Sequence, residues 1–280
     1  MTIPDGPLLV VSPHLDDAAL SCAALLDRAE PLDVVTVCTG RPRPPRQGDW
    51  DRACGFADSD EAISARIEEE RLAFAGTAHR LGQLGLFESQ YLDEPRPDKD
   101  VDVLRRYVND WVTRNGEGRV TVAVPACAGR VYHGLERVAG VPLGARRAAI
   151  KRLVGPIGRA ILGWANRRIV LRDDPVVHGD HRFVRDAILD GLTELSRTRI
   201  LLYEEVPYLW GHPADDEVAR TSARYHLRAT EIRIPVRRDA KASRVGAYRS
   251  QLPHLYRHQG HALDSVEGLP PVERYWLLQP

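Results

Sequence analysis

The sequence has 280 residues, of which 43% are hydrophobic and 28% are charged, and its formal net charge is zero. A chain of this length and composition is long enough for one large globular α/β domain or two small ones. Because positive and negative charges balance, nothing in the overall composition points to nucleic acid, and we expect no nucleic-acid partner.

The sequence also lacks the marks of export. The N-terminus has no basic leader, and no stretch approaches the ~20 apolar residues of a membrane-spanning helix. The cysteines are scattered without a C-x-x-C pair, at Cys22, Cys38, Cys54 and Cys127. This pattern favours a cytoplasmic protein with reduced thiols and makes a cysteine-based zinc site a poor fit.

Strands and helices alternate along the first half of the chain. The expected strands are Leu8–Ser12, Asp33–Thr39, Arg80–Leu86 and Val120–Pro125. The expected helices are Ala18–Ala29, Ser59–Ala78 (with Ser59 as its N-cap) and Val101–Arg114, and a loop rich in Pro, Gly and Arg spans Gly40–Asp60. Such alternation predicts an α/β fold of the Rossmann-like kind, with a mostly parallel sheet and helices on both faces.

The segment 128–172 interrupts this alternation. It holds ten basic residues and a single acid, Glu136, and its middle, Arg146–Trp164, fits a basic amphipathic helix. Two interpretations stay open: an insertion with a solvated basic face, or a surface for an anionic substrate or for membrane headgroups. The loop Arg41–Asp51 likewise suggests an anionic or large substrate, or an oligomer contact. We expect one domain over residues 1–280 that contains this basic insertion.

The alternation resumes after the insertion, less regularly. The expected elements are a loop that enters a helix over His178–Leu195, strands at Ile200–Glu204 and Thr230–Val236, and a helix over Asp239–Leu252.

Two clusters of polar residues carry the functional signal. Directly after the first apolar strand comes Ser-Pro-His-Leu-Asp-Asp-Ala, which places His14, Asp16 and Asp17 at the carboxyl end of that strand. Open α/β sheets build their ligand sites at this end. The second cluster is His178-Gly179-Asp180-His181. It supplies imidazoles that the first cluster lacks.

Together the clusters contain the groups of a hydrolytic zinc site, which uses three protein ligands and an open position for water. His14 and Asp17 can turn to one point, and His181 is the best third ligand. The bound ion would lower the pKa of its water toward ~7. Asp16 then suits a general base, and His178 suits an acid or an oxyanion stabiliser.

Simpler interpretations exist for each cluster. In a metal site, Asp180 can orient an imidazole through a hydrogen bond. Taken alone, however, an H-x-x-H pair in a polar loop is often only exposed to solvent. An Asp-Asp pair before a helix often caps it. The combination of the two clusters in one chain favours the metal site. A nucleotide-binding protein is disfavoured, because no G-x-G-x-x-G turn follows the first strand.

At these residues the chain resembles the PIG-L superfamily, also called the LmbE-like deacetylases. Pro13 to Asp17 match the family's P-H-x-D-D motif, and His178 to His181 match its H-x-D-H motif. Weaker similarities are Arg66-x-x-Glu69, the run from Tyr203 to Tyr208, and the run from Tyr248 to Gln251.

The resemblance implies a Rossmann-like zinc hydrolase that removes acyl groups from amino-sugar conjugates such as glycolipids, thiol precursors or natural-product glycosides. It implies His14, Asp17 and His181 as Zn²⁺ ligands, Asp16 as base and His178 as acid or oxyanion stabiliser.

The resemblance also implies Arg66 as a contact to substrate hydroxyl or phosphate groups. Two positions depart from the family pattern: Glu88 is the nearest candidate for a sugar-binding Asp, and Val176 stands where a Tyr is common. A catalytically silent homologue that binds a glycan or an anionic surface stays open as the alternative function.

Overall fold

The computed structural model describes residues 3–28, 30–116, 119–127, 178–191, 198–210, 213–255, 258 and 260–280. The basic segment 128–172, with its expected helix, lies outside the described residues, as does Val176. Among the described helices, none combines the length and the apolar character needed to cross a membrane.

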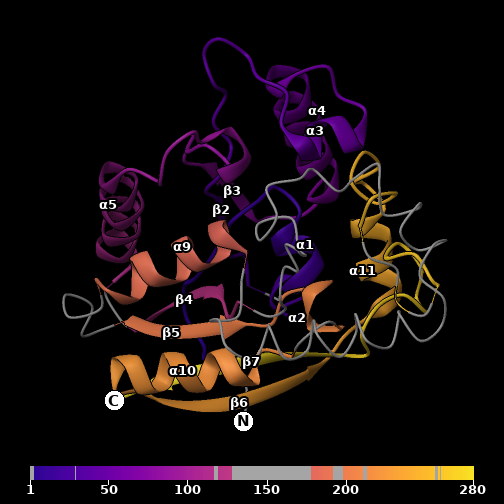
Figure 1. Ribbon diagram of the computed structural model, residues 1–280. Coiled ribbons are helices and arrows are strands. Elements are labelled where there is room, and N and C mark those ends of the chain that lie inside the picture. The colour runs from indigo at the N-terminus through magenta and orange to yellow at the C-terminus, as the bar shows by residue number, and fades with distance from the viewer. Residues whose placement is uncertain are drawn as a thin grey trace, which may run out of the picture. The chain divides into compact units, whose positions relative to one another are not determined.

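A seven-stranded mixed sheet forms the centre of the fold, in the order β3-β2-β1-β4-β5-β7-β6 (Figure 1). The strands are β1 (Leu8–Ser12), β2 (Asp33–Thr36), β3 (Arg80–Gln83), β4 (Val120–Pro125), β5 (Thr198–Tyr203), β6 (Arg228–Pro235) and β7 (Val272–Gln279). The first five run parallel, and β7 pairs antiparallel with both β5 and β6. The expected α/β fold with a mostly parallel sheet is therefore confirmed.

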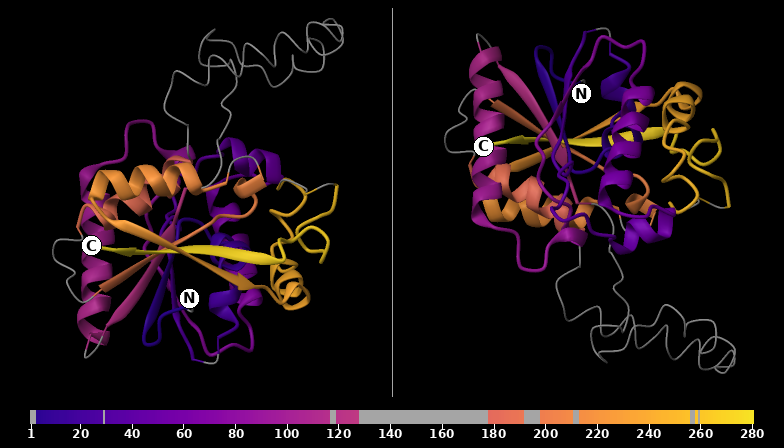
Figure 2. Two further views of the ribbon diagram at one scale, coloured as in Figure 1. Left: turned by 90° about the horizontal axis from the view of Figure 1, so that it is seen from below. Right: turned by 90° about the horizontal axis from the view of Figure 1, so that it is seen from above.

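Helices cover both faces of this sheet. The helices that the structure describes are α1 (Asp17–Ser21), α2 (Ala23–Leu26), α3 (Asp49–Cys54), α4 (Ser59–Ala73), α5 (Asp98–Asn115), α9 (Gly179–Leu189), α10 (Asp215–Tyr225) and α11 (Arg238–Val245). In both views of Figure 2 the long helices α4 and α5 stand on opposite sides of the sheet.

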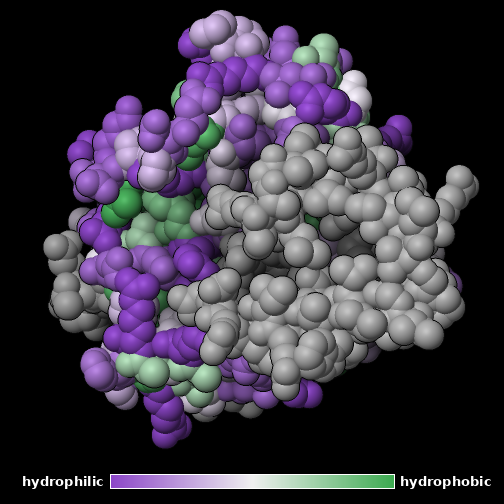
Figure 3. Space-filling model, in the orientation of Figure 1, coloured by the Kyte–Doolittle hydropathy of each residue, from purple (hydrophilic) through white to green (hydrophobic). Residues whose placement is uncertain are grey.

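The core follows from the two-residue period of the strands. Leu9 and Val11 of β1 face a cluster shared with α5, α9 and α10, whereas Leu8 and Val10 face a cluster shared with α1, α2 and α4. The strand is buried along its whole length, because helices cover both faces of a parallel sheet. Figure 3 shows apolar residues between α5 and α9, and most of the other residues coloured by hydropathy in that view are hydrophilic.

The expected helix 18–29 is instead two short helices that meet at Cys22. The break has a physical cause on the distant strand β7. The Glu273 carboxylate accepts the N–H groups of Ala23 (3.0 Å) and Ala24 (2.8 Å), which open α2. It also pairs with the fully buried Lys241 at 2.7 Å. This buried ion pair ties the C-terminal strand and α11 to the helices that follow β1.

The N-cap of α4 lies one residue earlier than the sequence predicts, and the structure contains three elements that were not predicted. Asp58, not Ser59, caps α4, since its side chain accepts the N–H groups of Asp60 and Glu61. Ser59 begins the helix, and its buried hydroxyl accepts the N–H of Arg46 at 3.1 Å. The elements that were not predicted are α3, α10 and β7.

Candidate metal centre

The candidate site lies where the chain leaves β1, at the point where the strand order of the sheet reverses. Ligand sites of open parallel sheets form at such points. The Ser12 hydroxyl donates to the His14 carbonyl (2.6 Å) and accepts the Ala18 N–H (3.1 Å). The His14 N–H donates to the Asp17 carboxylate at 2.9 Å. These hydrogen bonds fix the turn that presents His14 and Asp17.

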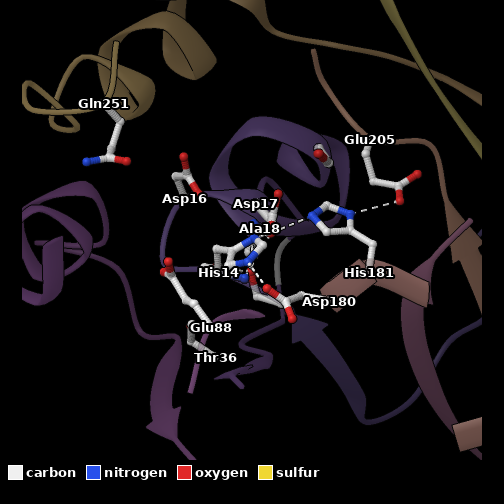
Figure 4. A network of polar contacts seen from close by, with 12 residues as sticks. His14, Asp16, Asp17, Ala18, Thr36, Glu88, Asp180, His181, Glu205 and Gln251 are labelled. Carbon is white, nitrogen blue, oxygen red and sulfur yellow. Dashed lines mark hydrogen bonds and ion pairs between the residues drawn. The ribbon is translucent and has the colours of Figure 1, made fainter. Parts of the chain in front are cut away.

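Three buried ligand-type atoms converge at this turn. His14 Nδ1 lies 3.1 Å and His181 Nε2 lies 3.3 Å from Asp17 Oδ2. Figure 4 shows both imidazoles turned toward Asp17, although His181 comes from α9. In a tetrahedral site with bonds of about 2.0–2.1 Å, neighbouring ligand atoms are about 3.3 Å apart. The group His14, Asp17 and His181 could therefore hold a metal ion.

A buried carboxylate stands behind each imidazole. His14 Nε2 lies 3.1 Å from Asp180 Oδ2, and His181 Nδ1 lies 3.1 Å from Glu205 Oε1. Glu205 also accepts the N–H of Cys127 at 2.8 Å, which ties the end of β4 to it. In metal sites such carboxylates fix the tautomer and the orientation of a ligating imidazole. The arrangement leaves His14 Nδ1 and His181 Nε2 to face Asp17.

The charges around these three side chains favour a cation. The nearby carboxylates are Asp16, Asp17, Glu88, Asp180 and Glu205, and the nearby guanidinium groups are Arg66 and Arg96. Burial alone would lower the pKa of His181, but Asp17 and Glu205 outweigh it and raise that pKa to about 9. Burial is likewise outweighed at His14, where Asp17 and Asp180 raise the pKa well above its usual value. The field that holds protons on these rings would equally attract a divalent ion.

A second group, His14 with Cys38 and Asp180, also has metal-like spacing. However, the Asp180 oxygens already accept the Ser89 N–H (3.0 Å), the Ser89 hydroxyl (3.1 Å) and the Arg96 guanidinium (2.5 Å). Burial also raises the pKa of the Cys38 thiol, whereas the thiolate is the metal-binding form. Both observations favour the group that contains Asp17.

Asp16 occupies the N-cap position of α1, but its side chain forms no capping hydrogen bond. Asp16 therefore stands at the cap position that the simple interpretation expects, but its carboxyl accepts none of the N–H groups that a capping side chain would accept. Its carboxyl is buried beside the turn that presents His14 and Asp17, and Arg66 Nη2 lies 4.0 Å from Asp16 Oδ1. Burial and the neighbouring Asp17 raise its pKa. A buried carboxyl without a capping role, next to three convergent ligand atoms, is suited to proton transfer.

Arg66 and Glu88 lie beside Asp16 and form a buried ion pair with each other. The sequence suggests both as separate substrate contacts, and it gave no sign that they would pair. Arg66 comes from α4, and Glu88 follows β3. Arg66 Nε is buried and has no hydrogen-bond partner among the described residues. The pair thus keeps one donor that a ligand could satisfy.

Sequence reasoning assigned no role to three other residues of the site. They are Glu205, Arg96 and Tyr208, whose ring packs edge-on against the His181 ring with centroids 5.3 Å apart. Glu205 and Tyr208 lie in the run from Tyr203 to Tyr208, so its position after a late strand was the available signal. His178 is partly buried and directly precedes α9. Its role as acid or oxyanion stabiliser stays a prediction.

Glu70 of α4 gives a pH-dependent prediction. The Thr36 hydroxyl donates to its carboxyl at 2.6 Å, and burial raises its pKa from 4.5 to about 7. Between these values the folded protein binds a proton that the unfolded chain releases, so the free energy of unfolding falls as pH rises. Glu70→Gln stays neutral, and we expect it to be more stable than wild type at pH 8 by about 3 kcal/mol.

Urea unfolding at pH 4 and pH 8 would measure this difference. At pH 4 the variant and the wild-type protein should have similar stability, because both then carry a neutral group. Glu267→Gln, at an exposed position with no ion pair among the described residues, is the control and should change neither value. A stability difference for Glu70→Gln that is equal at both pH values would refute the raised pKa.

Comparison with known proteins reveals the fold. No protein-family model and no curated protein sequence matches the chain. Among solved structures, a zinc-inhibited form of teicoplanin deacetylase Orf2 aligns over 97% of both chains, with a TM-score of 0.62 and 20% identity.

Two further structures have the same fold. The A40926 pseudoaglycone deacetylase Dbv21 aligns over 97% of this chain and 96% of its own, with a TM-score of 0.56 and 20% identity. A deacetylase–teicoplanin complex aligns over 98% of both chains, with a TM-score of 0.57 and 20% identity. The chain therefore has the α/β fold of these deacetylases, as its resemblance to the LmbE-like proteins led us to expect.

Proposed function

We propose that this protein is a zinc-dependent hydrolase that removes an N-acyl group, in the first instance an acetyl group, from an amino-sugar conjugate. One observation carries the proposal. The atoms His14 Nδ1, Asp17 Oδ2 and His181 Nε2 converge at the carboxyl end of β1, and a buried carboxyl, Asp16, lies beside them. This is the donor set of a catalytic zinc site with a separate base.

The fold of the chain supports the reaction class. The structural neighbours with this fold are named as deacetylases, and one is a zinc-inhibited form. The imidazole nitrogens and the carboxylate oxygen are donors that suit zinc. Asp180 and Glu205 contact the other ring nitrogens of the two histidines, as carboxylates that orient zinc-binding imidazoles do.

In the proposed mechanism, bound zinc supplies Lewis acidity for water and for the amide carbonyl. Asp16 accepts a proton from the water that attacks the carbonyl carbon. As the carbon–nitrogen bond breaks, the same proton passes from Asp16 to the departing amine. The carboxylic acid and the free amine of the sugar are the products, and transfer of the acid's proton to the amine gives the carboxylate and the ammonium form at neutral pH. His178 is proposed to donate a hydrogen bond to the oxyanion.

The substrate is proposed to be held by the pair formed by Arg66 and Glu88. The buried Arg66 Nε can donate to a sugar hydroxyl, and a Glu88 oxygen can accept from one. Of the conjugates considered, a natural-product glycoside has the most support, because the neighbours are named for teicoplanin and the A40926 pseudoaglycone. Roles in membrane contact or oligomer formation for residues 128–172 stay predictions.

A panel of N-acyl glucosaminides tests this proposal. The zinc-loaded protein would be incubated with each compound, and the free amine would be measured with an amine-reactive dye. We expect metal-dependent amine release from at least one N-acetylated glycoside. Tight binding of the glycosides without amine release from any of them would instead identify a silent, glycan-binding homologue.

A further inference from the structure

A cavity of about 490 Å³ lies between the segment that follows β2 and the segment that follows β3. Its apolar lining consists of Pro42, Phe87, Leu92, Pro95 and Pro97. This volume is within the range of small-molecule sites, which are typically apolar with a few polar groups. Because parallel strands end at the same edge of the sheet, the cavity and the metal centre share that edge.

Close backbone contact holds the two walls of the cavity together. The Gly40 N–H donates to the Leu86 carbonyl at 2.8 Å, and a Cβ atom at Gly40 would lie only 2.7 Å from Phe87 Cδ1. Arg46 reaches across from the first segment to the Tyr91 carbonyl at 3.2 Å. The cavity is therefore built into the fold, and Gly40 allows its walls to approach.

Of the three arginines that line the cavity, one has no ion-pair partner among the described residues. Arg43 is paired with Asp60, and Arg46 is paired with Asp93 at 2.7 Å. Arg41 lines the cavity, is exposed, and has no ion pair or hydrogen bond with any residue that the structure describes. A planar guanidinium beside apolar walls is suited to a carboxylate attached to an apolar body.

A negative charge on the lining favours a ligand with one negative charge over a ligand with two. Glu94 also lines the cavity and has no ion-pair partner among the described residues. Its negative charge disfavours a dianion such as a phosphate monoester, which would need more than one free cation. Together, Arg41, Glu94 and the ring of Phe87 favour an aromatic body with a single carboxylate.

The wall that carries Phe87 also supports the metal centre. The Phe87 carbonyl accepts from Arg96 at 2.9 Å, and Arg96 in turn pairs with Asp180, which contacts His14. Glu88, the next residue along the chain, pairs with Arg66. One segment thus lines the cavity and positions groups of the proposed active site.

We propose that this cavity binds an aromatic monocarboxylate, and that this group is the aglycone portion of the substrate; the second statement rests on the proposed deacylase function. Arg41 holds the carboxylate, and the proline and phenylalanine walls hold the ring. The amino sugar then lies toward Arg66 and Glu88.

Direct binding tests the cavity without any need for activity. Titration of the protein with 2-naphthoate, followed by calorimetry, should show binding that Arg41→Ala weakens about tenfold. The neutral 2-naphthylmethanol and the dianionic 2-naphthyl phosphate should bind more weakly than the carboxylate. Arg52→Ala, at an exposed arginine that does not line the cavity, should leave the affinity unchanged. Failure of 2-naphthoate to bind, or equal binding to Arg41→Ala, would overturn the proposal.

Hydrolysis then tests whether the cavity belongs to the substrate site. We expect 4-carboxyphenyl N-acetylglucosaminide to be deacylated with a kcat/KM about tenfold above that of the phenyl glycoside. Arg41→Ala should abolish this preference mainly through KM. Equal hydrolysis of both glycosides would refute the aglycone assignment and leave the deacylase function standing. Binding of 2-naphthoate without hydrolysis of either glycoside would refute the aglycone assignment together with the proposed function.

Discussion

Asp16→Asn is expected to lower the rate of amide hydrolysis by about 10²- to 10⁴-fold while the protein still binds zinc. The substitution keeps the size and shape of the side chain but removes its ability to accept a proton. Asp16 does not belong to the group of His14, Asp17 and His181 that could hold the metal ion, so metal binding should persist. Because its side chain caps no helix, the fold should also tolerate the change.

Steady-state rates and zinc content of the same preparation measure both parts of this prediction. Asp98→Asn, at an exposed position in the first turn of α5, is the matched control and should behave as wild type. A variant that binds zinc and turns over at nearly the wild-type rate would show that another group is the base.

His181→Ala is expected to abolish stoichiometric zinc binding. His181 is 1% exposed and supplies the only ligand atom of the three that does not come from the turn after β1. Without it, His14 and Asp17 offer two protein ligands, whereas hydrolytic zinc sites use three. Glu205→Gln should have a smaller effect, about 10- to 100-fold in affinity, because Glu205 orients His181 without being a ligand in our proposal.

Competition with a chromophoric zinc chelator gives these affinities. His254→Ala, which removes an exposed imidazole, is the control and should bind zinc as wild type does. Retention of one tightly bound zinc in His181→Ala would remove His181 from the ligand set. Equal losses for Glu205→Gln and His181→Ala would contradict the distinction between an orienting residue and a ligand.

The sequence predicted the parallel part of the fold because its signals are local. Apolar β-branched runs such as Val120–Pro125 mark buried strands, and the observed bounds of that strand are those expected. Strand β7 was missed because charged residues interrupt its apolar pattern. Glu273 is buried there only because Lys241 and the N–H groups that open α2 satisfy it. Those partners are far away in sequence.

In the candidate site, too, the parts set by local sequence could be predicted, and the parts set by distant contacts could not. The turn containing His14 and Asp17 could be placed from the sequence, since it directly follows a recognisable strand. The contact of Glu205 with His181 depends on how β4, β5 and α9 pack, which no local pattern reveals. Pairing between Arg66 and Glu88 likewise requires α4 and the segment after β3 to meet.

The most direct test of the central claim is removal and restoration of the metal. The purified protein would be stripped with a chelator, and amine release from an N-acetylglucosaminide would be followed as zinc is added back. We predict no activity in the stripped protein and full recovery at about one zinc per chain, with no recovery in His14→Ala. Full activity in protein shown by mass spectrometry to be free of metal would contradict the account.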